Sequence, residues 1–351
     1  MTATLTLNSF LRQAGAEVLI FDVGRRIGRL EPETWEQFEA ATVPYPLPLQ
    51  RKAWVGLVQI APEPGTADAA EPVIWFLRLS LDEQGLLVQA ERDYLLQRLL
   101  ESAQARGNGQ DDQDFLADNP YAFQPRQDRM ALFHALLSHE LNLPASRFYA
   151  HAAEYLGGEH DWDQWNFVGY QGIADAACRL ADTTLARAIP QLPDEPLVAL
   201  CHCLESRAIT GELRDALIDR LDKAAAPAVN ATGTVAALVR ALAGSASQAE
   251  TQQAVQRLLQ TPVGGDIEVL VAISGRAWEL LGEPAMRESY LQRLATNSHG
   301  QAAFRQCIDD LLSLPSLATD LRRSLRDEHA AAEVQLAFSR MLQDRDGDAG
   351  P

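Results

Sequence analysis

In the first hundred positions the apolar residues fall in short runs, several of them rich in β-branched and aromatic side chains, which is typical of β-strands. The predicted strands cover residues 17–23, 26–30, 53–61, 73–80 and 86–89. The predicted helices cover residues 7–13, 32–40 and 90–105. The second of these helices follows from Pro32, which suits a first helical turn, and from Trp35 and Phe38, which are three positions apart. Together these elements predict a small N-terminal sheet with flanking helices, an α+β unit.

From residue 127 to about residue 343 the apolar positions instead recur at helical spacing, with short breaks at proline or glycine. Two of the clearest apolar stripes are Leu132, Leu136, Leu137 and Leu141, and Leu197, Leu200, Cys201 and Leu204. The pattern predicts a larger all-α array of antiparallel helical hairpins, either HEAT-like or a compact bundle. No fixed repeat period holds along this part of the sequence.

Residues 106–125 mark the clearest boundary, because glycines, aspartates and prolines occur there without periodicity. Tyr121 and Phe123 within it argue that part of the segment is docked. The chain has 351 residues, which suggests two domains. The predicted organisation is an α+β domain (1–105), a linker or docked loop (106–126), an all-α helical domain (127–343) and a frayed tail (344–351).

The net charge of the chain argues against some classes of binding partner. It carries 30 basic and 48 acidic side chains, a formal net charge of −18. Such a chain repels nucleic-acid backbones and anionic membranes, so we expect neither as a partner and favour another protein with a basic surface. The sequence lacks a secretory signal and a long apolar span, which predicts a cytoplasmic protein. The oligomeric state stays open.

Cysteine and histidine clusters do not predict a metal site. In Cys201-His202-Cys203 the two cysteines point to nearly opposite sides of a helix, and no second pair lies at ligand spacing. His134 and His139 are five positions apart, and no HExxH motif exists. His151 and His160 could complete a site only if the fold brought them together. Serine-nucleophile and phosphate-loop motifs are also missing, so we expect no cofactor and lean against an enzyme.

Two local features stand out as candidate binding groups. Arg25, Arg26 and Arg29 form a basic turn that could grip a carboxylate or phosphate, or could pair with neighbouring glutamates. The aromatic residues Trp162 and Trp165, with Phe167 and Tyr170, could form a binding platform or seal the junction between the two domains. The candidate ligand or partner site comprises Arg25, Arg26, Arg29, Tyr121, Trp162, Trp165, Gln171 and Asp175.

Several fragments spread along the chain carry a family resemblance. They include Phe21-Asp22-Val23-Gly24-Arg25-Arg26, Ile74-Trp75-Phe76-Leu77, Asn119-Pro120-Tyr121 and Gln171-Gly172-Ile173-Ala174-Asp175. By these fragments the chain resembles the bacterial domain-of-unknown-function family numbered 3549. The resemblance implies a full-length, single-family cytoplasmic protein and brings no activity, cofactor or catalytic residue with it.

The leading hypothesis from the sequence is a non-enzymatic protein-interaction or scaffold protein, because helical arrays offer partner surfaces and no catalytic motif is present. The alternative is an enzyme or small-ligand sensor with an anion-accepting pocket at the domain junction.

Overall fold

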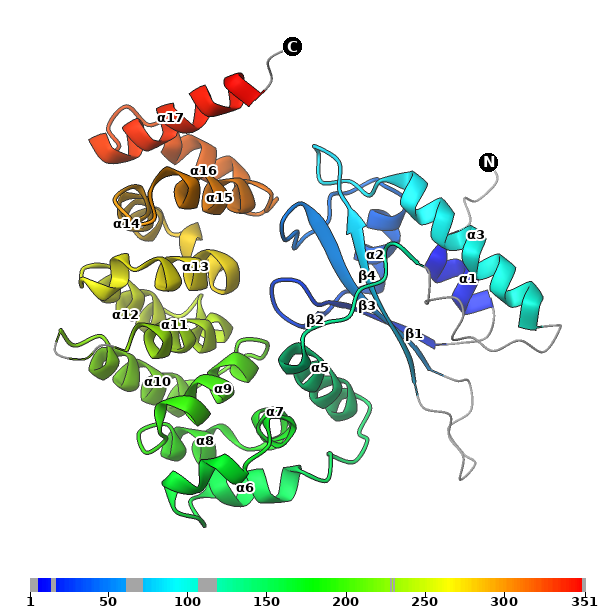
Figure 1. The fold of residues 1–351 in the computed structure, drawn as a ribbon, viewed down its shortest axis with the longest axis horizontal. Coiled ribbons are helices and arrows are strands. Elements are labelled where there is room, and N and C mark those ends of the chain that lie inside the picture. Colours follow the sequence, from blue (N-terminus) through cyan, green and yellow to red (C-terminus); the bar gives the residue numbers. More distant parts are fainter. Residues whose placement is uncertain are drawn as a thin grey trace. The chain divides into compact units, whose positions relative to one another are not determined.

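A computed structural model describes most of the chain (Figure 1). The described residues are 6–13, 17–60, 72–106, 119–227, 229 and 231–348. The chain divides into two compact units, one formed by Met1–Pro125 with Ser313–Ser316 and the other by Arg126–Leu312 with Leu317–Pro351. Most of the predicted linker, residues 107–118, lies outside the described residues.

The first unit is built on a four-stranded antiparallel sheet with the strand order β2-β1-β3-β4. The strands are β1 (Glu17–Asp22), β2 (Gly28–Arg29), β3 (Lys52–Ile60) and β4 (Val73–Ser80). In the register of the central pairs, Ile20 lies opposite Leu57, and Val55 lies opposite Leu77. All four of these side chains are buried, as expected for strands chosen by their β-branched and aromatic content.

Three helices accompany this sheet: α1 (Leu7–Gln13), α2 (Pro32–Glu39) and α3 (Gln89–Arg106). Pro32 opens α2 at its first turn, where a missing N–H has no cost. Trp35 and Phe38 of α2 are both buried, and the Phe38 ring packs against Tyr45 with the ring centroids 4.9 Å apart. These rings and the sheet residues belong to one hydrophobic core.

The predicted strand at residues 86–89 is wrong, because this segment makes only a single bridge, between Leu81 and Leu87. The Asp82 carboxylate accepts hydrogen bonds from the N–H groups of Gln84 and Leu86 and so holds a tight turn. Helix α3 then begins at Gln89, which leaves too few residues for a further strand.

The second unit consists of helices throughout its described part. They are α5 (Gln127–Glu140), α6 (Tyr149–Gly157), η1 (Trp162–Phe167), α7 (Tyr170–Arg179), α8 (Asp182–Ala188), α9 (Asp194–Leu204), α10 (Gly211–Ala224), α11 (Thr232–Ala241), η2 (Leu242–Ser245), α12 (Ala249–Leu259), η3 (Val263–Gly265), α13 (Ile267–Arg276), η4 (Trp278–Gly282), α14 (Pro284–Ala295), α15 (Gly300–Leu312), α16 (Ala318–Leu325) and α17 (Ala332–Asp348). The α+β class, with a small sheet followed by many helices, is confirmed. Helix α17 continues into the segment predicted as a frayed tail.

The helices of this unit stack in two rows (Figure 1). Helices α5, α7, α9, α11 and α13 contact one another in series, and α6, α8, α10, α12 and α14 form the second series. In each row a hydrogen bond joins two residues that are 35 positions apart in the sequence. In the first row Arg240 donates to Glu205, and in the second row Arg257 donates to Asp222. The helices of a row therefore form a structural repeat of irregular length, since those of the first row begin 43, 24, 38 and 35 residues apart.

The close packing of the rows depends on small residues. Gly172 of α7 lies against the carbonyl oxygen of Phe148 and against Ala152 of α6, and a Cβ at Gly172 would come within 2.5 Å of that oxygen. The neighbouring Ala174, Ala176 and Ala177 are completely buried. Among the described helices, none combines the length and the apolar character needed to cross a membrane.

Candidate functional site

The predicted basic turn is built into the first unit. Arg25 has no exposed surface, and its Nε donates a hydrogen bond to the carbonyl oxygen of Pro48 at 2.8 Å. Arg26 is half-buried, and Arg29 is exposed on the short strand β2. Arg25 thus helps to hold the segment around Pro48, and a ligand-binding role for these three arginines stays a prediction.

Tyr121, the other candidate residue of the first unit, belongs to a segment that pairs with β4. The N–H of Arg78 donates to the Tyr121 carbonyl oxygen, and the N–H of Phe123 donates to the Phe76 carbonyl oxygen. The Tyr121 ring packs edge-on against Tyr94 of α3, with the ring centroids 5.6 Å apart. The described end of the predicted linker is therefore docked on the sheet.

The remaining four candidate residues lie in the second unit. Trp162 and Trp165 are half-buried on η1, and the Trp162 ring packs edge-on against Tyr155. Gln171 donates to the carbonyl oxygen of Ala131 in α5 at 3.1 Å. Asp175 is buried and accepts the N–H of Ser146 at 3.2 Å. Gln171 and Asp175 therefore tie α7 to α5 and to the loop that follows it, and a pocket shared by all eight residues stays a prediction.

A different group of charged residues converges inside the second unit. Glu205, at the end of α9, has no exposed side-chain surface, and three arginines contact its carboxylate. Arg129 Nη1 lies 2.7 Å from Oε1, Arg240 Nε lies 2.6 Å from Oε2, and Arg276 Nε lies 3.3 Å from Oε1. We call Arg129, Arg240 and Arg276 around Glu205 the arginine cluster.

The helical rows explain why these residues meet. The arginines come from α5, α11 and α13, and these helices belong to the same row as α9. Arg240 lies 35 positions after Glu205 in the sequence, and Arg276 is the last residue of α13, the next helix of the row. Stacking the row therefore brings side chains from four of its helices, α5, α9, α11 and α13, together at one position.

The electrostatics of the cluster keep Glu205 ionised. Burial alone would raise the pKa of Glu205, but Arg276, Arg240 and Arg129 outweigh burial and hold that pKa below its usual range. His202, whose Nε2 lies 3.0 Å from Arg240 Nη1, is instead held in its uncharged form. Burial and the charge of Arg240 lower the pKa of His202 to about 4, so His202 is neutral at pH 7.

The three arginine side chains of the cluster are neither fully buried nor fully exposed. Their side chains retain 13%, 19% and 22% of their accessible surface for Arg129, Arg240 and Arg276. Planar guanidinium groups held in this way suit carboxylate or phosphate oxygens. Asp128, the other nearby carboxylate, pairs with Arg126 at 2.6 Å.

The arginine cluster was not predicted from the sequence. The only signal for it is a charged residue at the same place in successive repeats, Glu205, Arg240 and Arg276, and that signal needs the repeat to be known first. The predicted basic turn has three arginines within five positions, whereas the cluster draws its arginines from three separate helices.

A family model described as "Protein of unknown function (DUF3549)" matches residues 2–342 of the 351-residue chain. The chain belongs to this family. The near full-length match confirms the resemblance carried by the sequence fragments. No curated protein and no solved structure matches the chain. The family description assigns no activity.

Proposed function

We propose that this protein is a non-enzymatic binding protein whose helical array takes up an acidic segment of a partner protein at the arginine cluster. The observation that carries the proposal is the convergence of Arg129, Arg240 and Arg276 on the single buried carboxylate of Glu205. Among these four groups positive charge exceeds negative charge by two, on a chain whose formal net charge is −18.

The depth of the arginines supports a binding role. A fully exposed ion pair is weak because water screens it, whereas charge-assisted hydrogen bonds strengthen when one side of the donor is shielded from water. The exposed fraction of these side chains lies between 13% and 22%, so the helices shield most of each side chain while part of it stays in contact with solvent. An incoming carboxylate would gain from all three positive charges at contact distance.

The position of the cluster supports a protein ligand over a small molecule. It draws on four helices of one row, α5, α9, α11 and α13, and stacked helical rows characteristically offer extended surfaces to partner chains. Such a surface fits a peptide segment that contacts several repeats in succession.

Two electrostatic effects would act on a partner of this protein, one at long range and one at contact distance. The net charge of −18 favours a partner with a basic surface, but this attraction acts at long range and is screened beyond about 8 Å at physiological salt. The arginine cluster acts at contact distance and favours a carboxylate there. We place the interaction in the cytoplasm, a location that the four free cysteines support.

A peptide titration tests the proposal from the side of the ligand. A fluorescein-labelled Glu-Ser repeat peptide and its Gln-Ser counterpart are titrated with the full chain, and binding is followed by fluorescence anisotropy. We expect the Glu-Ser peptide to bind at least tenfold more tightly, and its affinity to fall as salt rises.

Two outcomes would overturn the proposal. Equal affinity for the two peptides would mean that the carboxylates do not decide binding. Displacement of the peptide by free glutamate or inorganic phosphate at concentrations close to that of the peptide would favour a small-anion sensor instead. Displacement that needs a large excess of these small anions is the expected result.

A further inference from the structure

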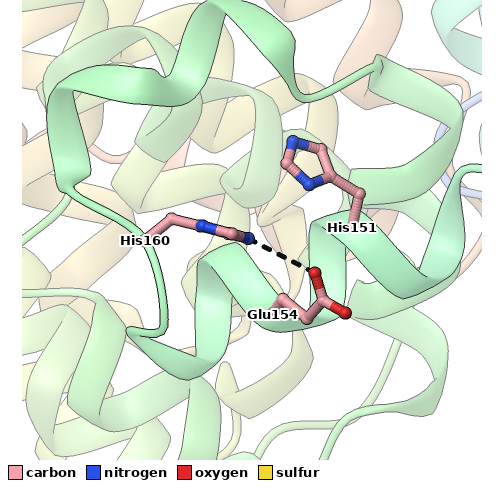
Figure 2. Close-up of side chains that lie close together, drawn as sticks. All are labelled: His151, Glu154 and His160. Carbon is pink, nitrogen blue, oxygen red and sulfur yellow. Dashed lines mark hydrogen bonds and ion pairs between the residues drawn. The ribbon is translucent and has the colours of Figure 1, made fainter.

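We propose that His151, Glu154 and His160 form a binding site for a divalent transition-metal ion, with Zn²⁺ as the best match. Their ligand atoms all lie within 4.8 Å of one another, and they are the only such group among the described residues. Figure 2 shows the His160 ring directed at the Glu154 carboxylate, with His151 beside them. This site is separate from the arginine cluster and does not depend on the proposed function.

Local structure explains why these three residues meet. His151 and Glu154 are three positions apart on α6, so they lie on neighbouring positions of one helix face. Helix α6 ends at Gly157, and the residue that follows it, Gly158, adopts a left-handed conformation with φ of 84°. This turn reverses the chain, and the N–H of Glu159 bonds back to the Glu154 carbonyl oxygen at 3.0 Å. His160 therefore returns to the helix face that carries the other two ligands.

The segment beyond His160 fixes this return. The Tyr155 hydroxyl donates to the carbonyl oxygen of Trp162 at 2.8 Å, and the two rings pack edge-on with centroids 5.4 Å apart. Tyr155 is buried and follows directly after Glu154. Because Trp162 is anchored to α6 only two positions after His160, the position of the His160 backbone is held as well.

The distances fit a metal ion of modest size. His160 Nε2 and Glu154 Oε2 are 3.3 Å apart, which is about the separation of two ligands on tetrahedral zinc, given metal–ligand bonds of about 2.0–2.2 Å. The rings of His151 and His160 have centroids 5.1 Å apart. His151 and Glu154 are exposed, so small side-chain rotations can bring the third ligand into place.

The ligand types select the class of metal. Two imidazoles favour zinc and its first-row neighbours over magnesium or calcium, which prefer oxygen ligands. Two histidines and one carboxylate leave a coordination position for water or for a ligand from another molecule, as in zinc sites with three protein ligands. The exposed position of His151 and Glu154 leaves this fourth position open to solvent.

The spacing of these residues hides the site from sequence inspection. His151 and His160 are nine positions apart, so a continuous helix would not place them together, and the left-handed turn at Gly158 brings them into contact range. The expectation of no metal, which rested on spacing, therefore gives way to this proposal.

The test is a titration of the tag-free full chain, stripped with EDTA, with Zn²⁺ alone by isothermal calorimetry. We expect one ion per chain in the wild type, and at least a tenfold loss of affinity in both His151→Ala and His160→Ala. His329→Ala is the matched control, because His329 also contacts a carboxylate, Asp327, at 3.2 Å and is not part of the group of three. This variant is expected to keep the wild-type affinity.

A Co²⁺ titration followed by visible absorption gives a second readout, since the intensity of the cobalt bands distinguishes four-coordinate from six-coordinate ions. We expect intense four-coordinate bands in the wild type that are lost in His160→Ala. Absence of stoichiometric zinc binding, or binding that is unchanged in both histidine variants, would overturn the proposal. Circular dichroism of each variant checks that the helical array is intact.

Discussion

Arg240 of α11 donates its Nε hydrogen to Glu205 Oε2 at 2.6 Å. This contact joins α9 and α11, two neighbouring helices of one row, through residues 35 positions apart in the sequence. The pair is shielded from water, with no exposed surface on the Glu205 side chain. Arg129 and Arg276 contact the same carboxylate, so Glu205 serves three helices at once. The buried Glu205 carboxylate thereby links helices of the row and gathers three positively charged side chains around it.

The first prediction concerns the stability of this arrangement. Glu205→Gln removes the buried carboxylate that three guanidinium groups contact, and removing one partner of a buried ion pair costs about 3–5 kcal/mol. We expect the free energy of unfolding of the second unit to fall by an amount of that order, measured by urea denaturation at pH 7. Asp222→Asn is the control, because its ion pair with Arg257 is half exposed and is expected to matter by less than about 1 kcal/mol.

The same variant has a defined pH signature. The folded-state pKa of Glu205 lies below the ordinary value of 4.5, so the stability it contributes is present above that value and is lost as pH falls through the folded pKa. The wild type should therefore lose stability below about pH 4.5 more steeply than Glu205→Gln. Parallel curves for the two proteins between pH 5 and pH 3 would contradict this assignment.

Glu39 in the first unit is predicted to respond to pH in the opposite direction. Its buried carboxylate accepts the N–H groups of Leu7 and Asn8 at the start of α1, yet burial outweighs these bonds and raises the pKa of Glu39. The folded unit then binds a proton more readily than the unfolded chain, so its stability rises as pH falls through the folded pKa toward the ordinary value of 4.5. Hydrogen exchange at Leu7 and Asn8, corrected for intrinsic rates, should slow accordingly.

Glu39→Gln supplies the check on this prediction, because an uncharged amide cannot titrate. Protection of the same amides in the variant should be independent of pH over this range. A wild type whose protection falls as pH decreases from 7 to 5 would show that the sign is wrong.

Gly172 is predicted to be intolerant of a methyl group. A Cβ there would come within 2.5 Å of the Phe148 carbonyl oxygen and 2.9 Å of the Ala152 Cβ, so α6 and α7 must separate. Gly172→Ala should destabilise the second unit by about 1–3 kcal/mol in thermal or urea unfolding. Gly275→Ala is the control, since its Cβ would have no neighbour within 4 Å and alanine favours a helix by up to about 1 kcal/mol. Equal behaviour of the two variants would contradict the packing described here.

The cysteines are predicted to be inert in the folded protein. Cys201 and Cys203 are buried, and burial raises the pKa of Cys178 and Cys201 to about 12 and also raises the pKa of Cys203. Because the thiolate is the reactive form, reaction with a disulfide reagent at pH 8 should be slower than in denaturant by on the order of 1,000-fold. A thiol among these three that reacts at the denatured rate in the native protein would refute the prediction.

Local patterns in the sequence were enough to predict most elements of the first unit. β1, β3 and β4 follow from runs of β-branched and aromatic residues, and α2 follows from Pro32 with its apolar spacing. The prediction of a strand at residues 86–89 was wrong, because the turn held by Asp82 and the early start of α3 leave room for only a single bridge, between Leu81 and Leu87. Strand propensity alone does not report such competition between neighbouring elements.

The charged sites could not be predicted in the same way, because they join residues that are distant in sequence or separated by a turn. Arg129 and Glu205 are 76 positions apart in the sequence, and no local pattern links the two. His160 meets Glu154 only through the left-handed turn at Gly158. The spacing of arginines along the sequence directed attention to Arg25, whose side chain is buried against Pro48.

The most direct test of the binding proposal compares three arginine variants in a calorimetric titration with the Glu-Ser peptide. Arg240→Gln and Arg276→Gln each remove one positive charge from the cluster, whereas Arg257→Gln removes one from an exposed pair with Asp222 in the other row. We predict at least a tenfold loss of affinity in each cluster variant, the magnitude of one charge-assisted hydrogen bond, and less than a twofold change in Arg257→Gln. Equal affinity in all three folded variants would contradict the account.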